Sequence, residues 1–176
     1  MGETCSAMRP LLSMLVLLAA AVPAAAAEPL REIRHPASGQ PAFRCLVPEN
    51  WTSQVDAGGN LLLANRGRTA NFSLAFTPSP RPREALDELA KELLDTAVTS
   101  PWDSREPAEI SGYRGFKYAA RVRAPNGVVV RAEVVLVAVG DQQIAVSSLL
   151  LAERVSPADE GTARLVHAAI RIAPGP

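Results

Sequence analysis

Three arginines near one predicted turn form the strongest candidate for a binding site in this sequence: Arg121, Arg123 and Arg131. In the hairpin predicted below, Arg121 lies directly opposite Arg131, and Glu133 lies diagonal to it. Guanidinium groups bind carboxylates and other anions. Two interpretations stay open: a site for an anion or an acidic partner, or a solvent-exposed end of a sheet whose repulsion is relieved by Glu133 or another acid.

The residue types that most often perform catalysis or bind metals are too few and too scattered in this chain. Its only histidines are His35 and His167, and the nucleophile motif G-x-S-x-G is absent. Two distant histidines and Cys45 lack the spacing of metal ligands, and no glycine-rich phosphate loop is present. We therefore predict no catalytic residue, no cofactor and no metal, and we expect His167 to be structural. A hydrolase is the weakest functional hypothesis.

The first 27 residues have the pattern of a secretory signal peptide. An apolar run, Leu11–Val22, follows Arg9 and is shorter than the roughly 20 helical residues that span a bilayer. Ala25 and Ala27 supply the A-x-A pattern that signal peptidase accepts. We expect cleavage near Ala27 and a periplasmic or extracellular mature chain without a transmembrane segment. Met8 is an alternative start that gives a more basic leading segment.

The mature chain has the size of one domain and carries no charge bias. Removing residues 1–27 from the 176-residue chain leaves 149 residues, enough to form one core. The formal net charge is zero, and the removed segment holds one acid and one arginine. The overall charge therefore gives no indication of nucleic-acid binding. Cys45 is then a single thiol: either a reactive or intermolecular one, or a small core residue, which we favour.

Hydrophobic periodicity divides the first half of the chain into a leader, three strands and a helix. Residues 28–41 contain prolines and no sustained pattern, which predicts a flexible leader before a single domain at 42–176. Alternation predicts strands at 42–47, 60–65 and 71–77. Apolar residues recurring at intervals of three and four predict an amphipathic helix over 82–97, followed by a loop that contains Trp102 and Pro107.

The second half predicts two consecutive antiparallel hairpins, formed by strands at 113–123, 128–139 and 142–151. A three-residue Pro-Asn-Gly loop pairs Val122 with Val130 and Phe116 with Leu136, and this register keeps the apolar side chains together. A two-residue Gly-Asp turn then pairs Leu136 with Ala145 and Ala132 with Leu149.

Both faces of this sheet are apolar in the middle, so each face needs a cover. The helix at 82–97 covers one face. A C-terminal helix that starts at Ser156-Pro157-Ala158-Asp159 covers the other. The predicted fold class is α+β: an antiparallel sheet of about six strands, ordered as three strands, helix, three strands, helix, flanked by helices in a three-layer sandwich.

Three short motifs resemble the PsbP/DcrB-like family. They are the strand and turn Phe43–Trp51 (FRCLVPENW), the segment Ile110–Gly115 (ISGYRG) before a strand, and the closing Ala168–Ile172 (AAIRI). The chain has Ala169-Ile170 where that family usually has Ser-Phe. The resemblance covers about residues 42–173 and implies an antiparallel sheet flanked by helices. It also implies binding rather than catalysis, because such families include non-catalytic subunits and accessory or chaperone-like proteins.

Two functional hypotheses follow from these observations. The leading one is an exported, non-catalytic accessory or assembly module that binds another envelope protein through a surface such as Arg121, Arg123 and Arg131. The alternative is a carrier that holds a small apolar ligand between sheet and helix.

Overall fold

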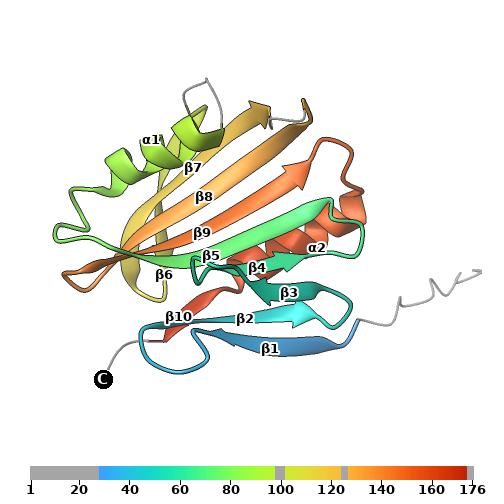
Figure 1. The fold of residues 1–176 in the computed structure, drawn as a ribbon. Coiled ribbons are helices and arrows are strands. Elements are labelled where there is room, and N and C mark those ends of the chain that lie inside the picture. The colour runs from blue at the N-terminus through green and yellow to red at the C-terminus, as the bar shows by residue number, and fades with distance from the viewer. Residues whose placement is uncertain (1–27, 98–101, 124–126, 174–176) are drawn as a thin grey trace, which may run out of the picture.

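The computed structural model describes residues 28–97, 102–123 and 127–173, which form two antiparallel sheets and two helices (Figure 1). The signal peptide expected in residues 1–27 lies outside the described residues. In chain order the elements are β1 (Leu30–His35), β2 (Ala42–Pro48), β3 (Thr52–Val55), β4 (Leu61–Ala64), β5 (Ala70–Pro78), α1 (Leu86–Ala97), β6 (Ser104–Ile110), β7 (Tyr113–Arg123), β8 (Val129–Val139), β9 (Gln143–Ala152), α2 (Pro157–Ala168) and β10 (Arg171–Ala173).

The large sheet has seven strands in the order β3-β4-β5-β9-β8-β7-β6, and the small sheet has three in the order β1-β2-β10. The described residues therefore contain an α+β fold with antiparallel sheets, as predicted, but with more than the expected six or so strands. β6 lies in the segment expected to be a loop, although it contains Pro107. Because β6 is an edge strand, a proline there removes no essential ladder hydrogen bond.

The leader expected at residues 28–41 is a strand over Leu30–His35, so that prediction is wrong for this segment. β1 pairs antiparallel with β2 along its whole length. Arg31 also donates from Nη2 to the Trp51 carbonyl oxygen at 2.8 Å, which ties β1 to the start of β3. Backbone hydrogen bonds to β2 hold β1 in the strand conformation, so β1 forms without an alternating apolar pattern of its own.

The register of the first predicted hairpin is confirmed. Val122 pairs with Val130, Ala120 with Ala132, and Phe116 with Leu136. The Pro125-Asn126 part of its connecting loop lies outside the described residues.

The register predicted for the second hairpin is wrong by one residue. Leu136 pairs with Val146 instead of Ala145, and Ala132 pairs with Leu150 instead of Leu149. The turn contains three residues, 140–142, and Gly140 has a φ of 62°, a left-handed conformation that glycine adopts without steric cost. Ala145 and Leu149 consequently face α2 and the small sheet, on the side of the sheet opposite α1.

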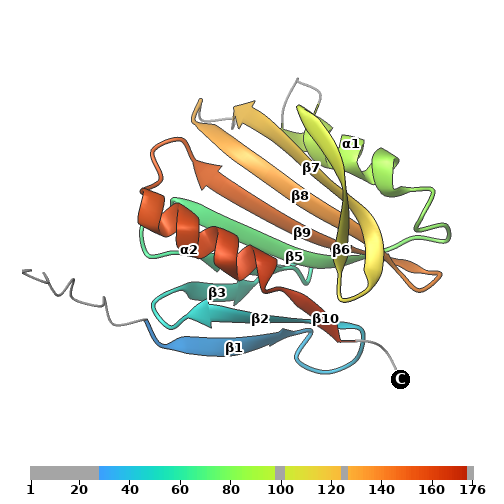
Figure 2. The same cartoon turned by 180° about the vertical axis from the view of Figure 1, so that it is seen from behind.

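The two helices lie on opposite faces of the large sheet (Figures 1 and 2). Leu86 and Ala90 of α1 pack on Tyr118, Val134 and Leu136. Ala163 and Val166 of α2 pack in the cluster on the other face. The predicted start of α2 is confirmed, because the Ser156 hydroxyl accepts a hydrogen bond from the Asp159 N–H at 3.1 Å. α1 begins at Leu86, four residues later than predicted.

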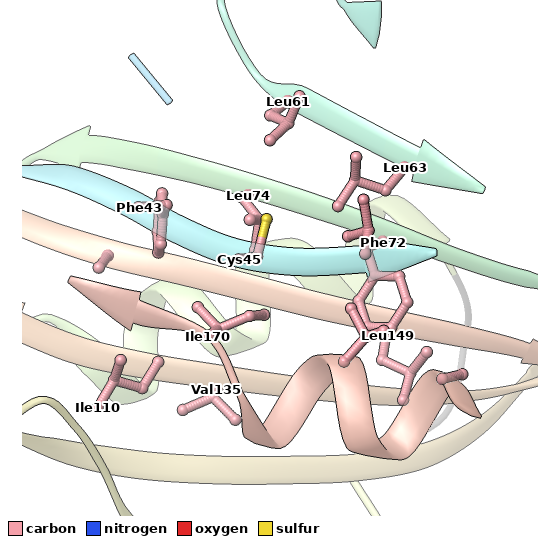
Figure 3. Close-up of a cluster of buried hydrophobic side chains, with 14 of the residues drawn as sticks. Phe43, Cys45, Leu61, Leu63, Phe72, Leu74, Ile110, Val135, Leu149 and Ile170 are labelled. Carbon is pink, nitrogen blue, oxygen red and sulfur yellow. The ribbon is translucent and has the colours of Figure 1, made fainter. Parts of the chain in front are cut away.

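The main core lies between the large sheet, α2 and the small sheet (Figure 3). β2 contributes Phe43 and Cys45, and Phe43 stacks on Phe76 of β5 with ring centroids 4.4 Å apart. Phe72 and Leu149 come from neighbouring strands of the large sheet. The small sheet therefore buries side chains that β5 and β9 present on the α2 side.

Candidate functional site

The three predicted site arginines lie at one end of β7 and β8, but they do not form a free cluster. Arg121 lies directly opposite Arg131, as predicted. Arg131, however, donates from Nη1 and Nη2 to the two carboxylate oxygens of Glu160, at 2.9 and 2.5 Å. Glu160 lies in the first turn of α2. A bidentate pair of this kind fixes both side chains, so Arg131 attaches α2 to the sheet.

The same carboxylate joins a longer ionic network. Glu160 Oε1 accepts from Arg164 Nε at 3.1 Å and from Nη2 at 3.0 Å, and Arg164 Nη1 donates to Glu133 Oε1 at 2.6 Å. Hydrogen bonds from Arg131, and next from Arg164, lower the pKa of Glu160. Glu160 is thus the acid that offsets the repulsion between Arg131 and Arg121, while Glu133 pairs with Arg164. The four-residue spacing of Glu160 and Arg164 on the predicted helix was the available signal for this network.

Arg121 and Arg123 keep exposed side chains. Arg123 Nη1 donates to the Gly127 carbonyl oxygen at 3.2 Å, and within the described residues neither guanidinium lies within ion-pair distance of a carboxylate. A depression of about 150 Å³ lies between Arg121, Arg131 and Glu153. The candidate surface that remains open to a partner is therefore Arg121 with Arg123.

His167 contacts a serine in the core of the protein. Its Nε2 lies 3.0 Å from Ser147 Oγ, and its ring lies 5.7 Å from that of Phe72. Ser147 is fully buried, with 0% of its surface exposed. A serine nucleophile needs access to its substrate, so this contact gives no hydrolase site. The described residues also contain no group of three or more His, Cys, Asp or Glu side chains placed to hold a metal ion.

We expect the free energy of unfolding to fall as the pH is lowered from about 7.5 to about 5.5, because burial lowers the pKa of His167 below 6.5. The folded chain keeps the ring neutral while the unfolded chain binds a proton. The contribution of His167 to the free energy of unfolding is present above pH 6.5, and it is lost as the pH falls towards the folded-state pKa. One such group changes the stability by at most about 1.4 kcal/mol per pH unit. Urea unfolding of His167→Gln should show a flatter pH dependence than the wild type, and equal slopes would contradict the assignment.

Cys45 is a core residue. Its side chain is 2% exposed, and its Sγ lies 3.8 Å from the Ile33 carbonyl oxygen. Burial raises the pKa of the Cys45 thiol to about 11. Because the thiolate is the reactive form, this thiol is unreactive in the folded protein.

A polar cluster holds α1 against the sheet. Arg105 donates from Nε and Nη2 to the two carboxylate oxygens of Asp87, at 2.7 and 3.0 Å, and the Tyr118 hydroxyl donates to Asp87 at 2.6 Å. Hydrogen bonds from Arg105, and next from Tyr118, lower the pKa of Asp87. Burial, followed by the bond to Asp87, raises the pKa of Tyr118 to about 12. Asp87 and Tyr118 therefore keep their charge states around neutral pH, and the cluster links α1 to β6 and β7.

An open cleft of about 1070 Å³ is lined by the β6–β7 hairpin, the start of α1 and the turn between β8 and β9. Leu86, Phe116 and Ala138 contribute apolar lining. The charged lining residues are Arg83, Glu109, Arg114 and Asp141. The cleft is large enough for a small ligand, and its lining mixes apolar surface with both signs of charge.

Comparison with solved structures identifies the fold. The chain has 14% identity to cyanobacterial PsbP (CyanoP) from Synechocystis sp. PCC 6803, with a TM-score of 0.57, and the match covers 82% of this chain and 92% of CyanoP. The chain has a PsbP-like fold. LpqN, involved in cell envelope biogenesis of Mycobacterium tuberculosis, matches with a TM-score of 0.56 at 14% identity over the same shares of the two chains.

A Bacteroides thetaiotaomicron protein matches with a TM-score of 0.50 at 16% identity, over 74% of this chain and 45% of the other. No protein-family model and no curated protein matches the sequence. The resemblance seen in the sequence motifs is thus confirmed for the PsbP-like fold. Within the described residues, no helix is long and apolar enough to cross a membrane.

Proposed function

We propose that this PsbP-like chain is an exported, non-catalytic accessory module that binds another protein of the cell envelope. The main support is the structural similarity to CyanoP and LpqN, which extends over 92% of each of those chains. LpqN is itself involved in cell envelope biogenesis. The burial of Ser147 beside His167 supports a binding role, since this pair offers no accessible nucleophile.

Export and domain limits are part of the same proposal. Signal peptide cleavage near Ala27 would leave Glu28 as the first residue, two positions before β1. β1 would then belong to the single domain and extend it to the beginning of the mature chain.

The partner surface that we propose includes Arg121 and Arg123. Arg131 lies beside them and holds α2 through Glu160. Changing Arg121 and Arg123 together to serine should weaken capture of the partner about fivefold, which corresponds to two exposed ion pairs of about 0.5 kcal/mol each. Capture should also lose part of its salt dependence. Affinity capture from the exporting cell between about 50 and 300 mM salt measures both effects.

The matched control is Arg81→Ser with Arg83→Ser, which removes two exposed arginines beside the start of α1. This control should capture the partner as the wild type does. Unchanged capture by the Arg121 and Arg123 variant at low salt would place the partner elsewhere.

The second candidate function, a carrier of a small apolar ligand, is favoured by the cleft beside Leu86 and Phe116. Native mass spectrometry of the exported protein distinguishes the two functions: a small molecule bound at one copy per chain supports the carrier.

A further inference from the structure

Three arginines form one row across the small sheet, on the face that points away from the core. Arg34 of β1 pairs with Arg44 of β2, which pairs with Arg171 of β10. Adjacent residues of a strand face opposite sides of the sheet, and the chain neighbours Phe43 and Ile172 pack in the main core. Side chains at directly paired positions stand about 5 Å apart. The row therefore concentrates positive charge on the outer face of the small sheet.

The contacts of this row do not balance its charge. Among the described residues, one carboxylate lies within ion-pair distance of the three arginines, namely Glu32, whose Oε1 is 4.0 Å from Arg44 Nε. Arg34 Nη2 donates to the Gly39 carbonyl oxygen at 2.8 Å, and Arg171 Nη1 donates to two backbone carbonyl oxygens near the end of α2. The row and Glu32 together keep a net charge of +2. Like charges at paired positions are destabilising, so a bound anion would stabilise this face.

A groove of about 920 Å³ lies between β2 and the segment 169–173, and both Arg44 and Arg171 line it. β10 is short and pairs only with the first three residues of β2, so β2 continues past it (Figure 2). Leu46, Ala169 and Ile172 add apolar lining. The groove thus has the size of a small-molecule site, with two guanidinium groups beside apolar surface.

The backbone of Leu46 adds a hydrogen-bond donor to this groove. The Glu49 N–H donates to the Pro29 carbonyl oxygen at 2.9 Å, and hydrogen-bonded pairs alternate along an antiparallel ladder. Leu46, three residues earlier, therefore directs its N–H and C=O away from β1, towards the other edge of β2. β10 begins opposite Arg44, so no strand of the described residues pairs with Leu46 on that edge.

A phosphate monoester fits these donors better than a carboxylate does. Its charge approaches −2 near neutral pH, which matches the net charge of the row with Glu32. Its terminal oxygens accept hydrogen bonds from guanidinium and backbone N–H groups. An apolar organic part attached to the phosphate would contact the apolar lining of the groove.

We propose that the groove between β2 and the segment 169–173 binds the phosphate monoester group of a small organic molecule, with Arg44, Arg171 and the Leu46 N–H as donors. This inference goes beyond the accessory role proposed above, because partner binding through Arg121 and Arg123 does not require it. In both views the small sheet lies away from β7 and β8, which carry or adjoin those two arginines (Figures 1 and 2).

Phenyl phosphate is the probe, because it joins a phosphate monoester to a small apolar ring. Titration of the protein followed by amide NMR should show one saturable site, with the largest shift at the Leu46 N–H. Arg44→Ser and Arg171→Ser, separately, should each weaken binding about tenfold or more, since each removes a charge-assisted hydrogen bond. Arg44→Ser alone decides the question if the loss of the Arg171 bonds to the backbone impairs folding, because the Arg44 side chain is 52% exposed.

The matched control is Arg66→Ser, which removes an exposed arginine between β4 and β5 and should bind phenyl phosphate as the wild type does. Sedimentation with phosphatidylcholine vesicles that contain phosphatidic acid distinguishes two sources of the phosphate. Cosedimentation that Arg44→Ser abolishes assigns the group to a lipid, and binding of phenyl phosphate without cosedimentation assigns it to a dissolved molecule. Either result supports the site.

Three results would overturn the inference: no saturable binding of phenyl phosphate by the wild type, equal affinity of the wild type and Arg44→Ser, or equally tight binding of phenol. Amide shifts confined to Arg121 and Arg123 would also overturn it. None of these outcomes affects the proposed accessory function, which is tested separately by capture of the partner.

Discussion

Val134→Asp is expected to unfold the protein or to destabilise it by about 3–5 kcal/mol. Val134 is 5% exposed and packs with Leu136 beneath Leu86 and Ala90 of α1. A carboxylate there would be buried without a partner, which is among the few single changes with effects of this size. For a domain of this length the melting temperature should fall by about 10 °C or more. Thermal melting followed by circular dichroism measures it.

The matched control is Val55→Asp, at the exposed end of β3, where the side chain is 58% exposed. This variant should melt close to the wild type. If Val134→Asp also melts like the wild type, the packing of α1 on β8 is wrong.

Gly115→Ala is expected to cost about 3 kcal/mol, an unusually large effect for the addition of one methyl group. A Cβ at position 115 would lie 1.8 Å from the Leu136 carbonyl oxygen and 2.8 Å from the Val137 Cα. Both atoms are backbone, so no side chain can move aside, and the pairing of β7 with β8 must open locally. Chemical denaturation measures the loss.

Gly161→Ala in α2 is the matched control, because a Cβ there meets nothing within 4 Å. It should stabilise the protein by about 0.8 kcal/mol through helix propensity. Equal stability of the two alanine variants would mean that β7 does not approach β8 closely at Gly115.

The candidate site was only partly predictable from the sequence. The opposition of Arg121 and Arg131 followed from the hairpin register, since the wrong register would bury these charges. The pairing of Arg131 with Glu160 depends on how α2 crosses the sheet, and the residues lie 29 positions apart.

The sequence by itself determined the α+β class, both helices and the first hairpin. In that hairpin one face carries Lys117, Arg121 and Glu133, so polarity alone selects the register confirmed by the structure. The tertiary structure decided the second hairpin, because β8 and β9 are apolar on both faces and a shift by one residue exchanges one apolar contact for another. It also decided β1, β6 and β10, whose own patterns are weak, because each is an edge strand held by pairing with one neighbour: β1 and β10 pair with β2, and β6 pairs with β7.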